Sequence, residues 1–300
     1  MATWRRLVLG LCAAACGWAV CVGAAHAQTD DAPTLRELDV WGRFAAGSWK
    51  QTHVVTEVLD SAGHVVSSTA SDVRTTLTRV DGRRITLRVA VTLDAGGRRF
   101  DTAPQVIDRG YFGETTDQPA QVRDLGKASV VIDGREIPVQ TREASIQSGK
   151  QKTVNKFFET GAMEPYLLRR ETHFTDSADP AANHDETSEV IAVDKPYRVQ
   201  SEVKPVSFER VVQKDTHGTT VTVDVTSVDV PGGIVKRTSK QLDADGHVTR
   251  RTTVELVDYG AVEEQAPDAG RRRYRRRRSR RIVLDHVDVT TDPIASPPPP

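Results

Sequence analysis

The chain has no cysteine after residue 27. All three of its cysteines, Cys12, Cys16 and Cys21, fall in an apolar stretch at the N-terminus. A protein that begins near Gln28 would therefore have no disulfide, no thiol nucleophile and no thiolate metal site. Such a protein must be stabilised by its packed core alone.

The apolar stretch has the pattern of a secretory signal peptide. Arg5 and Arg6 precede the run "LVLGLCAAACGWAVCVGAA", and "AHA" at 25–27 is a small-x-small cleavage site. We predict a signal peptide over residues 1–27, cut after Ala27, and a periplasmic or extracellular location. An uncleaved membrane anchor is the alternative, because the run approaches the length that spans a bilayer.

Aromatic residues and catalytic motifs are scarce. Aromatics make up 5% of the chain, and after the signal peptide the only tryptophans are Trp41 and Trp49, which argues against a sugar-stacking cleft. The sequence contains no nucleophile elbow, no H-E-x-x-H, no phosphate loop and no dinucleotide fingerprint. We therefore predict a protein without a cofactor that is not an enzyme, and keep a hydrolase as the less favoured alternative.

One loop gathers ligand-type residues. In "HFTDSADPAANHDE", His173, His184 and Asp185 would converge if the two histidines flank one hairpin loop. Imidazole and carboxylate suit a divalent metal. A solvated acidic loop around Pro180 explains the same composition more simply, so we predict no metal site and keep the three residues as candidates.

Alternating apolar and polar residues predict β-strands along most of the chain. In "RRITLRVAVTLD", Ile85, Leu87, Val89 and Val91 share one face, and "TTVTVDVTSV" alternates valines with Thr220, Thr222 and Asp224 in the same way. The sequence predicts an all-β fold, with one large, strongly curved antiparallel sheet in the form of a half-barrel or barrel-like meander.

Turn sequences rich in Asp and Gly divide these strands and set the expected organisation. Eight of them predict nine or more strands, joined mostly as hairpins; they lie at 59–64, 80–83, 93–97, 132–135, 147–150, 215–218, 230–233 and 242–247. "PTLRELDVWGRFAAG" (33–47) has helical spacing of apolar residues and predicts one short helix. We expect a linker and helix over 28–46, a β domain over 47–260, and a mostly disordered tail over 261–300.

The start of the predicted β domain resembles known carrier families. "GSWK" (47–50) follows an amphipathic segment and opens a long strand, which resembles the G-x-W start of lipocalin-type barrels. The order of leader, helix and cysteine-free antiparallel meander is similar to half-barrel carriers of the LolA/LolB/LppX type, and the stretch 44–116 resembles exported bacterial β-proteins. These resemblances imply a cavity for acyl chains. We therefore expect an apolar or lipid ligand on an apolar face formed by Trp49, Ile85, Leu87, Val89 and Val91.

Charge is strongly segregated along the chain. Residues 28–270 contain 30 basic and 38 acidic residues, and a run of nine arginines follows: Arg271, Arg272, Arg273, Arg275, Arg276, Arg277, Arg278, Arg280 and Arg281. Arginine outnumbers lysine 31 to 10 in the whole chain, so the run is also compatible with drift in a tolerant linker.

Two functional interpretations of the arginine run remain open. It could bind a polyanion, and the leader then favours an anionic envelope polymer or membrane surface over nucleic acid. It could instead fold back on the acidic body. The sequence thus predicts an exported envelope protein that binds an apolar or lipid ligand, with an interaction or scaffold protein tethered by the run as the alternative.

Overall fold

A computed structural model describes residues 33–95, 98–115 and 117–262. The predicted signal peptide, most of the predicted C-terminal tail and the arginine run lie outside these residues. The described part of the chain is mainly antiparallel strand. The strands are β1 Trp49–Leu59, β2 Val65–Val80, β3 Arg84–Ala95, β4 Arg98–Asp101, β5 Gln105–Gly110, β6 Gln121–Ile132, β7 Arg135–Ser148, β8 Gln151–Glu159, β9 Leu167–Asp176, β10 His184–Val199, β11 Glu202–Asp215, β12 Gly218–Thr226, β13 Ile234–Leu242 and β14 Val248–Gly260.

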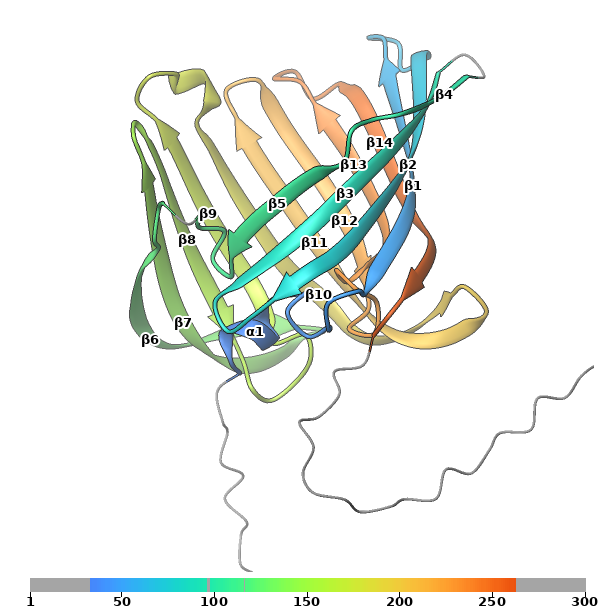
Figure 1. Cartoon of the computed structure of the whole chain (residues 1–300). Helices are drawn as coiled ribbons and strands as arrows, with labels where there is room; N and C mark the ends of the chain where they lie inside the picture. The colour runs from blue at the N-terminus through green and yellow to red at the C-terminus, as the bar shows by residue number, and fades with distance from the viewer. Residues whose placement is uncertain (1–32, 96–97, 116, 263–300) are drawn as a thin grey trace, which may run out of the picture. The chain divides into compact units, whose positions relative to one another are not determined.

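The strands form one open sheet of 14 strands, which confirms the predicted fold class. Their order is β4-β3-β2-β1-β14-β13-β12-β11-β10-β9-β8-β7-β6, with β5 paired to β3 beside β4. The sheet curves into a half-barrel, and its two edges are formed by strands that follow each other in the chain (Figure 1). The chain must therefore cross from the β5 edge to the β6 edge, and we call the described residues between the two strands, 111–115 and 117–120, the strap.

All eight predicted turns lie between consecutive strands. The two turns with the sequence L-D-x-x-G-H-V, at 59–65 and 242–248, are stabilised by the same hydrogen bonds. Asp60 accepts hydrogen bonds from the backbone of Ala62 and His64, and Asp243 does the same two and four residues onward. A short carboxylate that caps backbone N–H groups stabilises such turns.

The predicted helix exists but is short. Helix α1 covers only Leu35–Leu38, capped by Thr34 and Glu37 in a capping box. It ends because Asp39 accepts hydrogen bonds from the backbone N–H of Trp41 and Gly42, which folds the chain into a turn instead of a further helical turn. In the described part of the chain, no helix has both the length and the hydropathy needed for a membrane crossing.

The turn after α1 places Trp41 in the core at one end of the sheet. Trp41 is 5% exposed and packs with Leu77, Ile85 and Leu87 of β2 and β3. The segment 39–48, which we call the plug, is also tied to the end of β14, because Ser48 Oγ accepts a hydrogen bond from the backbone of Val262 (2.9 Å). The plug thus packs on β2 and β3 and is also hydrogen-bonded to the chain that follows β14.

Two further apolar clusters stabilise the rest of the sheet. One holds Leu168, Phe158 and Val139, and the other holds Val199, Val206 and valines from β12 and β13. The three clusters are separate, which follows from the large extent of a single curved sheet. We infer that no one residue carries the stability of the whole sheet.

The cluster under the plug yields a stability prediction. Ile85 is fully buried, so Ile85→Ala should lower the free energy of unfolding by about 2–5 kcal/mol, through lost burial and a residual cavity. Leu93 lies on the same strand and is 41% exposed, so Leu93→Ala should cost much less. Urea unfolding followed by circular dichroism compares the two, and equal losses would contradict the placement of the core.

Candidate ligand cavity

The inner face of the half-barrel contains a cavity of about 750 Å³. Its walls come from α1 and the plug, from the strap, and from β8 to β13. A smaller cavity of about 370 Å³ shares Phe112, Gly113, Asn155, Arg170 and Glu186 with it. The two therefore meet at the strap and at the inner faces of β8, β9 and β10.

A stripe of polar side chains runs across the inner face of five neighbouring strands. Successive residues of a strand point to opposite faces, so the register decides which side chains meet inside. Glu209 of β11 lies opposite Asp224 of β12, which in turn lies opposite Arg237 of β13. Glu186 and Ser188 of β10 and Arg170 of β9 extend the stripe.

The best-defined interaction in the stripe joins Asp224 and Arg237. The Arg237 guanidinium donates two hydrogen bonds to the Asp224 carboxylate, from Nε at 2.7 Å and Nη2 at 2.6 Å. The Asp224 side chain is 3% exposed and that of Arg237 is 39% exposed. The acid thus lies behind the arginine and orients its guanidinium at the cavity wall, in the two-pronged geometry that makes such pairs strong.

Lys50 lies next to this pair. It is buried, and Nζ donates a hydrogen bond to the carbonyl of Gly232 (3.1 Å) and lies 5.6 Å from the centre of the Trp41 ring. Burial, aided by the positive charge of Arg237, lowers the pKa of Lys50 to about 8, while Asp224 acts in the opposite direction. Lys50 therefore packs against Trp41 and Gly232 and is not itself part of the stripe.

Glu209 has a different environment from the other acids of the stripe. Its carboxylate accepts a hydrogen bond from the Ser188 hydroxyl, and no lysine or arginine among the described residues forms an ion pair with it. Burial raises the pKa of Glu209, the Ser188 hydrogen bond lowers it, and the neighbouring Asp224 raises it further. Glu209 is thus a half-buried acid, largely shielded from water, whose charge has no direct counter-ion among the described residues.

The remaining pairs of the stripe are more exposed. Arg170 donates a hydrogen bond from Nη2 to Glu186 (2.8 Å), with both side chains partly open. The Thr172 hydroxyl donates to Asn155 Oδ1 (2.7 Å). The inner face of β8 to β10 is therefore able to donate and to accept hydrogen bonds.

Apolar side chains form another part of the cavity wall. Leu35, Leu38 and Val40 of α1 and the plug contribute to it, and none of them is fully buried by protein. Phe112 of the strap packs against Phe157 of β8 with ring centres 5.4 Å apart. The cavity therefore presents an apolar wall and a polar wall to the same space.

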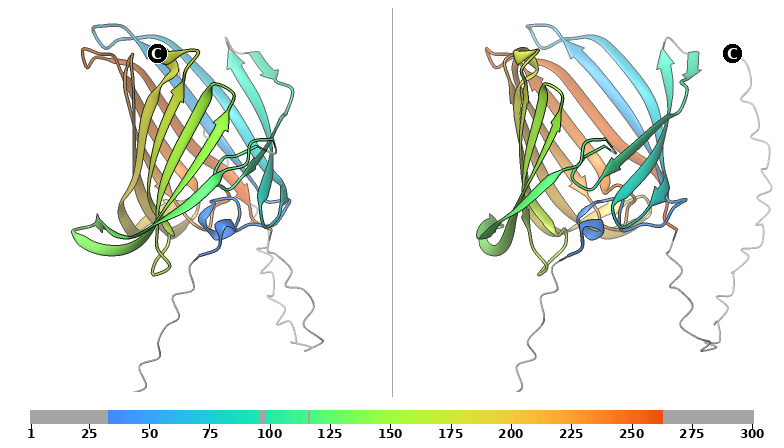
Figure 2. Two further views of the ribbon diagram at one scale, coloured as in Figure 1. Left: turned by 90° about the vertical axis from the view of Figure 1, so that its left-hand side faces the viewer. Right: turned by 60° about the vertical axis from the view of Figure 1, so that its left-hand side comes forward.

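The strap is fastened where it leaves β5. Arg109 pairs with Asp39 of the plug (2.8 Å), and the Tyr111 hydroxyl donates to the carbonyl of Asp81. At its far side, Gln118 donates to Ser148 of β7 (2.6 Å). The strap thus links both edges of the sheet (Figure 2). Its residues Tyr111, Phe112 and Gly113 line the cavity.

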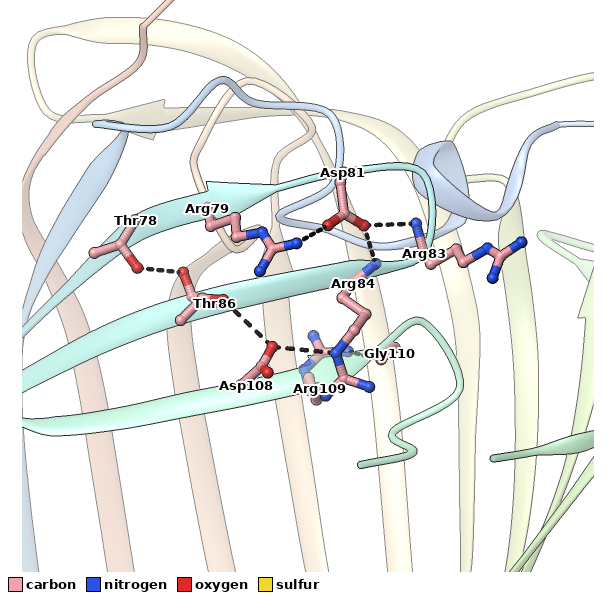
Figure 3. A network of polar contacts seen from close by, with 9 residues as sticks. All are labelled: Thr78, Arg79, Asp81, Arg83, Arg84, Thr86, Asp108, Arg109 and Gly110. Atoms are coloured by element: carbon pink, nitrogen blue, oxygen red, sulfur yellow. Dashed lines mark hydrogen bonds and ion pairs between the residues drawn. The ribbon is translucent and has the colours of Figure 1, made fainter. Parts of the chain in front are cut away.

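A polar network at the β2–β3 turn stabilises this fastening (Figure 3). Asp81 accepts hydrogen bonds from the backbone N–H groups of Arg83 (2.9 Å) and Arg84 (2.8 Å), which lower the pKa of its carboxyl group. Asp108 of β5 accepts from Arg84 and Thr86 of β3 at 3.3 Å each. These contacts hold the short strand β5 on β3, so the strap starts from a defined position.

The cavity is lined by residues other than the five that we predicted for an apolar ligand. Ile85 and Leu87 are buried under Trp41, and Val89 and Val91 continue their face of β3 without reaching the cavity wall. Trp49 precedes the inward Lys50, so it lies on the opposite face, where Arg74 stacks on its ring at 3.8 Å. Trp41, not Trp49, closes this end of the sheet, and ligand binding by the five residues stays a prediction.

The three candidate metal ligands do not converge on one point. His173 pairs with Asp185 across β9 and β10, whereas His184 lies one position along and stacks on Phe174 at 5.0 Å. Neighbouring positions of a strand face opposite sides, so His184 points away from the pair. Among the described residues, ligand-type side chains instead come together at Asp243, Asp245 and His247, in one of the hairpin turns.

No motif in the sequence marks the polar stripe as a site. The alternation in β12 predicts a polar face of Thr220, Thr222 and Asp224, and such a face often lies toward solvent in an antiparallel sheet. In the structure this face lines the cavity, while Val223 on the other face is 39% exposed. Alternation shows that a strand has two faces, but only the curvature of the sheet decides which face is inside.

Comparisons with known proteins give only distant likenesses. No family model and no curated protein matches the chain. Solved structures that resemble it include a protein described as a lipoprotein from Parabacteroides distasonis, with 9% identity over 74% of this chain and 98% of that one and a TM-score of 0.30. A protein described as exported, with a YmcC-like fold, from Bacteroides fragilis has 7% identity over 72% and 100% of the two chains and a TM-score of 0.28.

A third likeness is to the complex of MucA and MucB from Pseudomonas aeruginosa. It has 12% identity over 74% of this chain and 91% of that one, with a TM-score of 0.17. Because all of these TM-scores lie below 0.5, they carry no argument about what the chain binds. The function must be argued from the cavity itself.

The buried carboxyl group of Glu209 yields a pH-dependent prediction. An acid whose pKa is higher in the folded than in the unfolded protein binds more protons when folded, so it makes stability fall as the pH rises above the ordinary carboxyl range. Glu209→Gln keeps an acceptor for Ser188 and removes this effect. We expect the variant to melt higher than the parent protein at pH 8, by about 2–4 °C for each kcal/mol gained, and to show a smaller gain at pH 4.

Glu189→Gln is the matched control for this measurement. Glu189 follows Ser188 in β10 and pairs with Arg210 on the opposite face (3.7 Å), with both side chains exposed. Its replacement should change the melting temperature little at either pH. A Glu209→Gln gain that is equal at pH 4 and pH 8 would show that ionisation of Glu209 does not oppose folding.

Proposed function

We propose that this protein is an exported, non-enzymatic binding protein of the cell envelope that holds an amphiphilic ligand in the half-barrel cavity. The observation that carries the proposal is the cavity of about 750 Å³, whose lining combines an apolar wall with a polar stripe. A purely apolar ligand would leave the stripe without partners, and a purely polar one would leave the apolar wall in contact with water. A molecule with both parts satisfies both walls.

The size and composition of the cavity support this proposal. Cavities of roughly 300–1,000 Å³ with a few oriented polar groups on an apolar background are typical of small-molecule sites. Leu38 and Phe157 contribute apolar area, while Arg170 and Arg237 are held in place by acids behind them. Export, as the leader sequence predicts, would place such a protein among envelope lipids.

Binding of the neutral fluorophore N-phenyl-1-naphthylamine tests the proposal. We expect its fluorescence to rise with micromolar affinity on addition of the protein, because an apolar wall excludes water from the dye. Leu38→Arg places a charge on that wall and should weaken binding at least tenfold. Val223→Arg places the same charge on the other face of β12 and should leave binding unchanged. Dye binding that responds equally to both variants would locate the site outside the cavity.

A second candidate function rests on the run of nine arginines at 271–281. We propose that this run tethers the protein to anionic envelope polymers or lipids, each arginine contributing on the order of 1 kcal/mol near such a surface. The protein should sediment with phosphatidylglycerol vesicles and not with phosphatidylcholine vesicles, and binding should fall as salt rises.

Replacement of the nine arginines by serine is the test variant for the tether. It should abolish sedimentation with anionic vesicles and leave dye binding in the cavity unchanged. Vesicle binding equal to that of the parent protein would assign the run to a linker without a partner. A loss of several degrees in melting temperature would instead indicate that the run stabilises the acidic body.

A further inference from the structure

Acidic residues outnumber basic residues in the lining of the cavity. Four arginines and six acidic residues contribute to its walls. Each arginine already has an acidic partner: Arg43 pairs with Glu164 (2.9 Å), Arg109 with Asp39 (2.8 Å), Arg170 with Glu186 (2.8 Å) and Arg237 with Asp224 (2.6 Å). All four arginines of the cavity lining therefore already form ion pairs with carboxylates of the protein itself.

Among the described residues, two acids of the lining have no basic partner at ion-pair distance. One is Glu209, which accepts a hydrogen bond from the Ser188 hydroxyl, and the other is Asp194, which is exposed. Lys50 is the nearest additional cation, but its Nζ bonds the Gly232 carbonyl behind the Asp224–Arg237 pair. The charge in the cavity lining that is left without an ion-pair partner is thus negative.

This imbalance selects among ligand head groups. An anionic head group would meet the uncompensated carboxylate of Glu209. The guanidinium groups that it could reach, those of Arg170 and Arg237, already have their positive charge balanced by Glu186 and Asp224. A cationic head group meets Glu209 directly and compensates its buried charge.

We propose that the cavity ligand carries an ammonium group that forms an ion pair with Glu209, and that its chain lies on the apolar wall formed by α1 and the strap. This inference rests on the proposed amphiphile-binding function and names the chemistry of the head group. Ser188 orients the Glu209 carboxylate, and an N–H donor of the ligand occupies the direction that Ser188 leaves open.

The charged groups around Glu209 come from every strand of the stripe. Arg170 of β9 and Glu186 of β10 lie on one side, and Asp224 of β12 and Arg237 of β13 lie on the other. Within each pair the opposite charges largely cancel. The protonation state of Glu209 therefore sets the net charge that a ligand meets.

Three molecules with the same twelve-carbon chain test the inference by displacing N-phenyl-1-naphthylamine. They are dodecylamine, laurate and monolaurin, which carry a positive, a negative and a neutral head group, each used below its critical micelle concentration. We expect dodecylamine to displace the dye at least tenfold more effectively than laurate at pH 7.5, with monolaurin between them. Laurate or monolaurin binding more tightly than dodecylamine would overturn the inference and leave amphiphile binding standing.

The variant Glu209→Gln assigns the effect to one residue. It should remove most of the preference for dodecylamine and change monolaurin binding little, whereas Glu189→Gln on the opposite face should behave as the parent protein. Dodecylamine binding to the parent protein should weaken as the pH is lowered and Glu209 becomes protonated, because a protonated Glu209 cannot pair with an ammonium group. The preference surviving in Glu209→Gln would overturn the inference.

Spermidine separates the two possible sources of an ammonium group. It carries positive charges and no long chain, so it should compete far less well than dodecylamine if the ligand is a lipid. Equal competition by spermidine that depends on Glu209 would support the ion pair and contradict the proposed amphiphile. Failure of all four molecules and of the dye would contradict the proposed function itself.

Discussion

The packing of Trp41 holds together parts of the sheet that are far apart in the sequence. Its ring contacts Leu77, Ile85 and Leu87 on one side and approaches the β12–β13 turn on the other. At that turn Gly232 has a φ of +71°, and a Cβ atom there would lie 2.6 Å from the ring. Only glycine satisfies both the backbone conformation and the close contact.

The cavity depends on this packing. The Gly232 carbonyl next to Trp41 accepts the hydrogen bond of Lys50, which lies beneath the Asp224–Arg237 pair. The Arg109–Asp39 pair connects the same plug to the strap. One end of the half-barrel is thus closed by a small, well-ordered segment, and the polar stripe and the apolar wall are positioned relative to it.

The polar stripe has a cost and a consequence. Charged side chains on the inner face of a sheet lose hydration, and pairing offsets this loss only where the geometry is good. Asp224 and Arg237 meet that condition, whereas Glu209 does not, and burial raises its pKa. A group that stays uncompensated inside a cavity is a common mark of a binding function, and this is why Glu209 is central to the proposed head-group site.

Local sequence determined much of this protein. Alternation of apolar and polar residues and eight Asp/Gly turns determined the antiparallel strands, because side-chain period and turn chemistry act over a few residues. The capping box at Thr34 determined where α1 begins. These features are short-range, and the structure confirms the predicted strands and turns.

Only the tertiary structure decided which face of each strand is inside. Ile85 and Val223 both belong to well-alternating apolar faces, yet the first is buried under Trp41 and the second is exposed on the convex side. In the sequence, Trp41 is one of several apolar residues at helical spacing. In the structure, Trp41 packs at the end of the sheet and closes it, whereas Trp49 lies on the opposite face. Pairings such as Asp224 with Arg237, and the absence of one for Glu209, depend on the register and curvature of strands brought together by long-range contacts, which no local pattern encodes.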